Sequence, residues 1–197
     1  NRTINEFKIA NEIKTIYNFV DTDRFNGEVT DCNVKQFAPN GEKILIHTSN
    51  FRPVKRLTKT IEIFAKVRKH IPAKLLLVGE GPDRQASHEK SIELGVHDDV
   101  IYLGLQHYIE NLLGCADIFL IPSGEESFGL AALEAMACKT PVIGSKIGGI
   151  PEVVDHGING FLHPLDDVDA MAESALKLLQ NEKKLKAFKE NARDKAL

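Results

Sequence analysis

The sequence lacks the features that mark several classes of protein. No apolar run approaches the roughly 20 residues that a helix needs to span a bilayer, and no signal peptide is visible. We therefore expect no membrane partner. The chain begins with Asn1 rather than Met, which suggests a fragment or a processed chain. Its formal net charge is only −3, which argues against a general nucleic-acid binder.

Cysteine is scarce as well. Cys32, Cys115 and Cys138 are odd in number and widely spaced, so we expect no disulfide framework and a cytoplasmic, reducing location. Each of them could equally serve as a small buried apolar residue. The 3 Cys and 7 His show no metal-ligand spacing, so we expect neither a metal nor another cofactor.

The usual motifs of several enzyme classes are also missing. There is no Walker A sequence, and Gly79-Glu-Gly81 lacks the third glycine of a dinucleotide fingerprint, so a nicotinamide site is weakly supported. No Ser-His-Asp or Cys-His nucleophile can be assigned from sequence order alone.

What the sequence does contain is a regular alternation of short apolar runs and helical patterns. With 197 residues and 43% hydrophobic content, the chain is long enough for a real core. The alternation predicts an α/β fold with a doubly wound, Rossmann-like parallel sheet covered by helices on both faces. The expected strands are 43–48, 74–78, 100–103, 117–121, 141–144 and 160–163, and the expected helices are 57–70, 82–94, 107–115, the segment from 128, 150–154, 166–180 and 182–197.

Ligands of such sheets bind outside the carboxyl ends of the strands. The loops at those ends are 49–56, 79–82, 104–107, 122–128 and 145–149, and they hold nearly every polar residue of interest. The segment that precedes the first strand is polar, with a weak β pattern over 14–20 and with Gly27 and Pro39 as punctuation.

The central stretch is the strand 117–121, a loop of small and acidic residues, and a helix that we expect to begin near Phe128. Free N–H groups at a helix start attract anions such as phosphate, and Gly129 allows close approach to the backbone. On one helix, Glu126 and Glu134 would lie about 12 Å apart. That separation suits two hydroxyl-bearing groups of an extended ligand, although two Glu on a helix surface are usually just solvated charges.

The run Glu126-Ser-Phe-Gly-Leu-Ala-Ala-Leu-Glu134 resembles the E-x7-E motif of the retaining glycosyltransferases of family four, which have the GT-B fold. Five further stretches resemble the family in the same order, and together the matches span about residues 43–180. The resemblance implies the C-terminal half of a two-domain enzyme. Residues 1–40 would be the end of the N-terminal domain and the crossover segment, and residues 41–197 the nucleotide-sugar donor-binding domain. The five further stretches are 74–82, 100–104, 138–144, 148–154 and 156–162.

Carried over by position, the resemblance implies a role for each motif residue. Glu126 would bind the donor hexose beside the backbone N–H groups of Phe128 and Gly129. Leu130 N–H would reach the diphosphate, and Glu134 would accept from the ribose hydroxyls. The stretch from Leu103 to Gln106 would border the uracil. Retention without a protein nucleophile is implied, with the departing diphosphate taking the acceptor proton, so Glu126 is catalytic by position and charge rather than as a base.

The leaving diphosphate gains charge in the reaction and needs cations. Lys55 is placed to supply one, as the second catalytic residue. The family commonly carries Arg five residues before this Lys, where this sequence has Asn50, so Arg52 or Arg56 is left to supply the second charge.

Two short stretches, 16–21 and 49–56, resemble the family members that transfer N-acetylglucosamine from UDP to L-malate in bacillithiol biosynthesis. We therefore expect UDP-N-acetylglucosamine as donor, malate bound through the missing domain, and no turnover by this chain alone. A non-catalytic nucleotide-sugar-binding module, a transferase with another acceptor, and an epimerase on the same fold are the alternatives. A homo-oligomer is left open.

Overall fold

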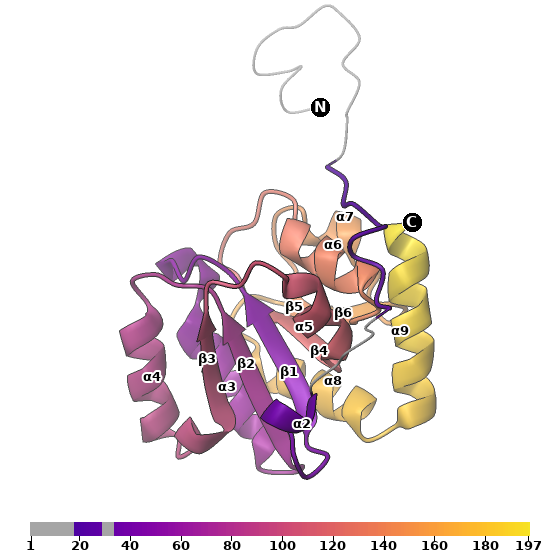
Figure 1. Ribbon diagram of the computed structural model, residues 1–197. Helices are drawn as coiled ribbons and strands as arrows, with labels where there is room; N and C mark the ends of the chain where they lie inside the picture. Colours follow the sequence, from indigo (N-terminus) through magenta and orange to yellow (C-terminus); the bar gives the residue numbers. More distant parts are fainter. Residues whose placement is uncertain (1–17, 29–33) are drawn as a thin grey trace, which may run out of the picture.

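The computed structural model describes residues 18–28 and 34–197. Their six strands form one sheet in the order β3-β2-β1-β4-β5-β6, and every neighbouring pair is parallel (Figure 1). This is the order of dinucleotide-binding sheets, and it confirms the doubly wound, Rossmann-like prediction. The strands are β1 (Lys43–Thr48), β2 (Ala73–Val78), β3 (Val100–Gly104), β4 (Ile118–Ile121), β5 (Val142–Ser145) and β6 (Gly160–His163).

Helices cover both faces of the sheet. On one face α3 and α8 pack together, and on the other α6 packs against α5 and α7, while α9 contacts both α6 and α8. The short helix α2 and two 3-10 turns, η1 and η2, complete the described residues. The helices are α2 (Val34–Phe37), α3 (Leu57–Arg68), α4 (Arg84–Glu93), α5 (Ile109–Cys115), α6 (Leu130–Ala137), α7 (Ile150–Val153), α8 (Val168–Leu179) and α9 (Glu182–Ala196); the turns are η1 (Pro53–Lys55) and η2 (His97–Asp99).

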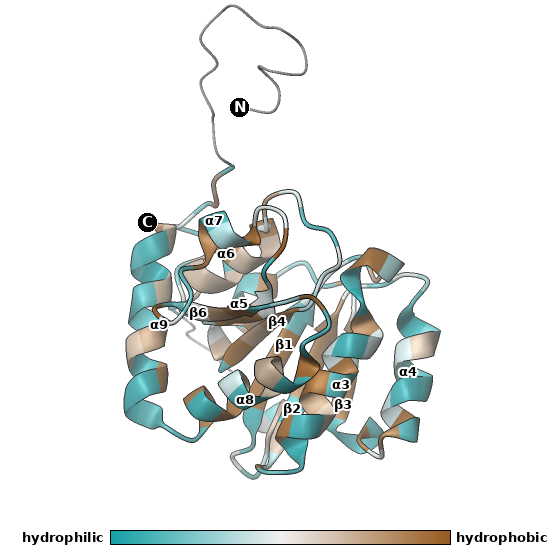
Figure 2. Cartoon of the chain, turned by 180° about the vertical axis from the view of Figure 1, so that it is seen from behind, coloured by the Kyte–Doolittle hydropathy of each residue, from teal (hydrophilic) through white to brown (hydrophobic). Residues whose placement is uncertain are grey.

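The apolar runs form strands because the sheet buries both of its faces. In β1, Leu45 packs into the core on the α3 and α8 side, while Ile44 and Ile46 pack into the core on the α6 side. A strand buried on both faces needs apolar residues in succession rather than in alternation. Figure 2 shows the result, with hydrophobic strands inside and hydrophilic outer surfaces on α4 and α9.

The element boundaries differ from the predictions by one or two residues, with one difference that matters. Helix α6 begins at Leu130, two residues after Phe128, because Gly129 adopts a left-handed φ of 93° that a right-handed helix excludes. Helix α2 was not predicted at all, since four residues are too few to show a helical period.

The segment before β1 lies against the body in its described part. Phe25 is buried, and Arg193 on α9 donates from Nη1 to the carbonyl oxygen of Phe25 and from Nη2 to that of Thr22. The expectations for residues 1–12, for most of 14–20 and for Cys32 lie outside the described residues. The domain boundary at 40/41 stays a prediction.

Cys115 is disulfide-bonded, which the sequence did not predict, although one bond does not make a disulfide framework. Spacing along the chain does not show which thiols fold close together. Cys138 is free and buried, and burial raises the pKa of its thiol to about 12. Among the described helices, none is long and apolar enough to cross a membrane.

Candidate functional site

The loops that follow β1 and β4 meet at the carboxyl end of the sheet. These two strands are neighbours at the centre of the sheet, where the strand order reverses, so their loops diverge to opposite sides and leave a crevice. The backbone N–H of Gly124, after β4, donates to the carbonyl oxygen of Val54, after β1, at 2.7 Å. The topology therefore brings together two segments that lie about seventy residues apart in the sequence.

Lys55 and Glu126 form an ion pair across this junction. Lys55 Nζ lies 2.6 Å from Glu126 Oε2, and the two side chains are only 23% and 15% exposed. Lys55 ends the η1 turn, which Pro53 opens with its fixed φ. Glu126 lies on the loop before α6, so it projects from a different direction. The two predicted catalytic residues are therefore in direct contact.

A polar hollow of about 290 Å³ surrounds this ion pair. Within the described part of the chain the Arg52 guanidinium has no ion-pair partner, and it lines the hollow. Arg56 does not line it and instead pairs with Asp166, just before α8. The geometry thus separates the two candidates for the second cation and favours Arg52. The lining residues are Asn50, Arg52, Val54, Lys55, Glu125, Glu126 and Ser127.

A second hollow, of about 330 Å³, is lined by the first residues after β1 and is mostly apolar. Glu134 on α6 is its one acidic residue. Burial raises the pKa of the Glu134 carboxyl, and the Arg24 cation opposes this effect only weakly. No side chain among the described residues hydrogen-bonds to this carboxylate. The lining residues are Thr48, Ser49, Val78, Gly79, Leu105, Gln106, Ile109, Leu130, Ala131 and Glu134.

The two glutamates flank the start of α6 rather than sharing one helix. Gly129 directly precedes the helix, and Glu126 lies three residues before Gly129. Glu134 is on the second turn of the helix. The same-helix separation of 12 Å therefore does not apply. The free N–H groups at the start of α6 lie between the two carboxylates, and the helix dipole makes this end attractive to an anion.

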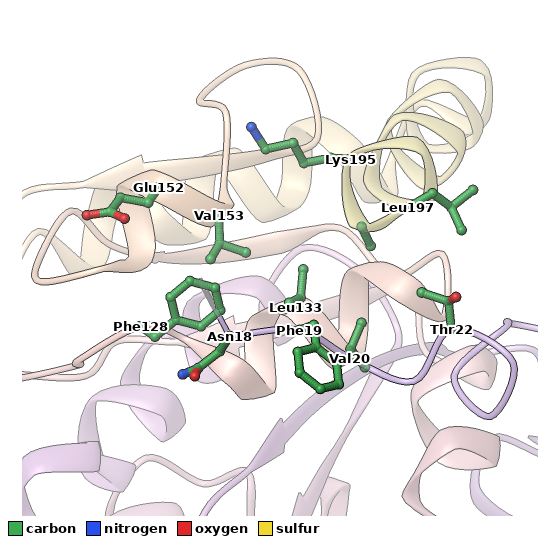
Figure 3. A pocket seen from close by; sticks show the side chains of 11 residues that line it. Asn18, Phe19, Val20, Thr22, Phe128, Leu133, Glu152, Val153, Lys195 and Leu197 are labelled. Atoms are coloured by element: carbon green, nitrogen blue, oxygen red, sulfur yellow. The ribbon is translucent and has the colours of Figure 1, made fainter. Parts of the chain in front are cut away.

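Three predicted residues, Leu103, Phe128 and Gly129, line neither of these hollows. The carbonyl oxygen of Leu103 accepts a hydrogen bond from Gln106 Nε2 at 2.6 Å, which leaves Gln106 and its neighbour Leu105 at the surface of the second hollow. Gly129 contributes only backbone. Phe128 lines a third hollow, of about 460 Å³, where its ring lies below Val153 (Figure 3).

Glycines allow the loops of the site to pack backbone against backbone. A Cβ on Gly79 would lie 1.8 Å from the carbonyl oxygen of Ser49, and one on Gly81 would lie 2.1 Å from that of Asn50. A Cβ on Gly148 would lie 1.8 Å from the carbonyl oxygen of Glu126. Side chains at these positions would push the loops apart, so the glycines fix the shape of both hollows.

Several lining residues were not singled out from the sequence. Thr48, Ile109 and Ala131 are apolar or small, and each lies within a few residues of a predicted position. Their nearness to those positions was the only available signal. No group of three or more His, Cys, Asp or Glu among the described residues could hold a metal ion.

Comparisons with known proteins identify the family of the chain. The family model of the glycosyl transferases group 1 matches residues 30–195. The chain is 41% identical over 195 residues to the N-acetyl-alpha-D-glucosaminyl L-malate synthase of Bacillus anthracis, covering 98% of this chain and 51% of that protein. It is 30% identical over 179 residues to the D-inositol 3-phosphate glycosyltransferase of Mycolicibacterium smegmatis, covering 86% of this chain and 40% of that one. The chain thus spans about half the length of the curated relatives it matches.

Solved structures of the GT-B glycosyltransferases share the fold. The chain superposes on Anabaena HepE in complex with UDP with a TM-score of 0.84 and 27% identity, covering 93% of this chain and 52% of that one. It also matches the C-terminal domain of the group 1 family protein LpcC from Francisella tularensis, with a TM-score of 0.75 and 25% identity, covering 89% of this chain and 95% of that one. The prediction that the chain folds as one half of a GT-B enzyme is confirmed.

Proposed function

The chain belongs to the glycosyl transferases of group 1, and from this premise we propose that it is the donor-binding half of a retaining enzyme that transfers N-acetylglucosamine from UDP to L-malate. One observation carries the proposal. The Lys55–Glu126 ion pair lies just before the start of α6, and the helix carries Glu134 into a separate hollow. Cations and N–H donors in the middle, with a carboxylate at each end, match the parts of a nucleotide sugar.

The diphosphate belongs in the middle of this arrangement. Lys55 and Arg52 provide positive charge, and the N–H groups of Gly129 and Leu130 provide donors at the positive end of the helix dipole. Charge is needed here because the diphosphate is the leaving group and becomes more negative as the glycosidic bond breaks. Arg52 takes the place of the arginine that the family commonly carries where this chain has Asn50.

The two carboxylates receive the hydroxyl-bearing parts. Glu126 faces the polar hollow and accepts from the hexose hydroxyls, with the Phe128 N–H nearby. Glu134 accepts from the ribose hydroxyls, since one carboxylate can hold two O–H donors. The uracil lies over Leu105 and Gln106, with the Leu103 carbonyl already occupied by the Gln106 amide. Hollows of about 330 and 290 Å³ are each of a size for one part of this donor.

The reaction that follows needs no protein nucleophile. The bond from the anomeric carbon to the diphosphate oxygen breaks, and the hydroxyl oxygen of malate bonds to the same face of that carbon. The hydroxyl proton passes to the departing diphosphate oxygen. Lys55 stabilises the charge of the leaving group, and Glu126 stabilises the positive charge that develops on the sugar. Neither a metal nor a cofactor takes part.

Malate as acceptor rests on the relative in Bacillus anthracis and on the two short stretches 16–21 and 49–56. Its site belongs to the N-terminal domain, so this chain alone holds the donor without transferring the sugar. A cytoplasmic location agrees with these soluble substrates. The second candidate is a transferase with another acceptor, which the likeness to the D-inositol 3-phosphate glycosyltransferase favours. A non-catalytic nucleotide-sugar module is the third.

A thermal-shift panel on the purified chain tests the proposal. UDP and UDP-N-acetylglucosamine should raise the melting temperature, because a ligand at a hundred times its dissociation constant stabilises the native state by about 2.7 kcal/mol. GDP and ADP should raise it less. An unchanged melting temperature with every UDP compound would contradict the donor assignment. Turnover by this chain alone with malate would instead show that the assignment of the acceptor to another domain is wrong.

A further inference from the structure

A buried histidine lies at the end of β1, just before the loop that contributes residues to both hollows. His47 is the fifth residue of β1, it is 1% exposed, and it lines neither hollow. Its ring stacks on Phe119 of β4, with centroids 6.4 Å apart. A charged or polar side chain is rarely buried this deeply unless its hydrogen-bonding groups are satisfied.

Both ring nitrogens of His47 have partners. Nδ1 lies 2.8 Å from the carbonyl oxygen of Leu120 on β4, and Nε2 lies 2.8 Å from Ser49 Oγ. The carbonyl can only accept, so the proton of the neutral ring is on Nδ1, and Nε2 accepts from the Ser49 hydroxyl. Burial supports the neutral form, because it lowers the pKa of His47 to about 4.

The chain of hydrogen bonds continues into the loop. Ser49 Oγ accepts from the backbone N–H of Phe51 at 3.2 Å. Phe51 is fully buried and adopts a left-handed φ of 43°, a conformation that a bulky residue holds only when its surroundings enforce it. The relay from Leu120 through His47 and Ser49 therefore ends on the strained residue between Asn50 and Arg52.

The position of the relay matches the place where the sheet opens. In the parallel register of β1 and β4, Leu45 pairs with Ile118 and Ile46 pairs with Phe119. One residue further along each strand, the His47 side chain bridges the two strands in place of backbone pairing. Beyond it the loops separate to form the crevice.

We infer that His47 is a positioning residue for the donor diphosphate, acting through Ser49 on the loop that carries Asn50, Arg52 and Lys55. The inference rests on the proposed function. The relay keeps the Phe51 turn in its left-handed conformation, and this conformation determines the distance of the Arg52 side chain from Lys55 and Glu126. A histidine suits this task because one neutral ring supplies a donor to one side and an acceptor to the other.

The test compares UDP affinity by titration calorimetry in wild type and in His47→Phe, which keeps a stacked ring but removes both hydrogen bonds. Since His47 lines neither hollow, a loss of affinity cannot arise from a lost contact with UDP. We expect about a tenfold weaker affinity, the size of one net hydrogen bond. His47→Gln, which retains a donor and an acceptor, should recover part of it.

The matched control is His163→Phe. His163 Nε2 lies 2.9 Å from Ser174 Oγ, so this pair has the same chemistry on β6 and α8, away from both hollows. It should leave UDP affinity unchanged. Ser49→Ala keeps the inference testable if His47→Phe does not fold, because hydrogen exchange of the Phe51 amide should then become faster without any ligand present.

The outcomes separate the two claims. If wild type binds no UDP, the proposed function fails and this inference with it. If wild type binds UDP but His47→Phe binds equally well, or if the Phe51 amide stays protected in Ser49→Ala, the relay does not position the loop and only this inference is overturned.

Discussion

Lys55 Nζ is 2.6 Å from Glu126 Oε2, so in the free protein the cation proposed for the diphosphate neutralises the carboxylate proposed for the hexose. Each group thereby avoids being a partly buried unpaired charge, which would be costly. A bound donor would offer Lys55 a phosphate and Glu126 a set of hydroxyls, so both groups could exchange one partner for another without either charge being left alone. Under the proposed function, the pair is thus both a structural contact and a preformed part of the donor site.

Replacing Lys55 should be severe for nucleotide binding. In Lys55→Gln the diphosphate loses a charged hydrogen bond worth about 1.5–3 kcal/mol, and it also meets the now unneutralised Glu126. UDP affinity by calorimetry should therefore fall by at least tenfold, and its dependence on salt should become weaker. The matched control is Lys59→Gln, which breaks the partly buried pair with Glu62 on α3 and should change neither. Equal affinities in the two variants would remove Lys55 from the site.

Replacing Glu134 should stabilise the folded protein and weaken nucleotide binding. Its carboxyl pKa is raised by burial, so the folded state favours the protonated form; that stabilisation is present below the ordinary pKa of 4.5 and is lost as pH rises through the folded value. At neutral pH the ionised group therefore costs stability. Glu134→Gln should raise the melting temperature at pH 7 by on the order of 1–3 °C.

The same change should weaken UDP binding, because an amide accepts the ribose hydroxyls less strongly than a carboxylate does. Wild type should also prefer UDP to 2′-deoxy-UDP, and the variant should lose most of that preference. Glu190→Gln, at an exposed position of α9, is the control for both measurements. A variant that is less stable than wild type and still binds UDP with full affinity would contradict both parts.

The sheet and the general location of the site could be predicted from the sequence because both depend on local patterns. A strand such as β2 is a continuous apolar run. The loop after β4 can be recognised because small and acidic residues are followed there by good helix formers. The parallel topology then requires the loop ends to share one edge. The E-x7-E spacing added the identity of the two carboxylates.

What could not be predicted depends on contacts between distant residues. Arg56 is excluded from the polar hollow by Asp166, 110 residues later in the chain. The ring of Phe128 lines a different hollow from Glu126, two residues earlier, beside Val153 of α7. The disulfide at Cys115 likewise depends on the folded chain rather than on spacing. Neither the Arg56–Asp166 pair nor the Cys115 disulfide has a signature within ten residues.

The buried His47 should give the protein a measurable loss of stability in mild acid. Its folded pKa of about 4 lies below the ordinary 6.5, so the stability that the neutral ring permits is present above pH 6.5 and is lost as pH falls toward 4. Between pH 7 and pH 5 this one group should remove about 2 kcal/mol from the free energy of unfolding. Urea unfolding of wild type and His47→Gln at both pH values isolates the effect.

His47→Gln should lose that much less stability than wild type between the two pH values, since glutamine does not titrate. The exposed His70 provides the control, and His70→Gln should follow the wild-type pH dependence. If the pH dependence of His47→Gln equals that of wild type, the ring is not neutral and buried in the way the Leu120 and Ser49 contacts require.

Replacing Gly148 should weaken binding of the hexose rather than binding of the nucleotide. It has a left-handed φ of 55°, and a Cβ there would lie 1.8 Å from the carbonyl oxygen of Glu126, to which Gly149 N–H donates at 3.0 Å. Gly157 has a φ of 82° but nothing within 4 Å of its Cβ position. Both Gly→Ala variants carry the cost of a left-handed alanine, about 1 kcal/mol. Only Gly148→Ala also displaces Glu126, so it alone should lower the affinity for UDP-N-acetylglucosamine toward that for UDP. An equal loss of affinity for both ligands would mean that Glu126 does not hold the sugar.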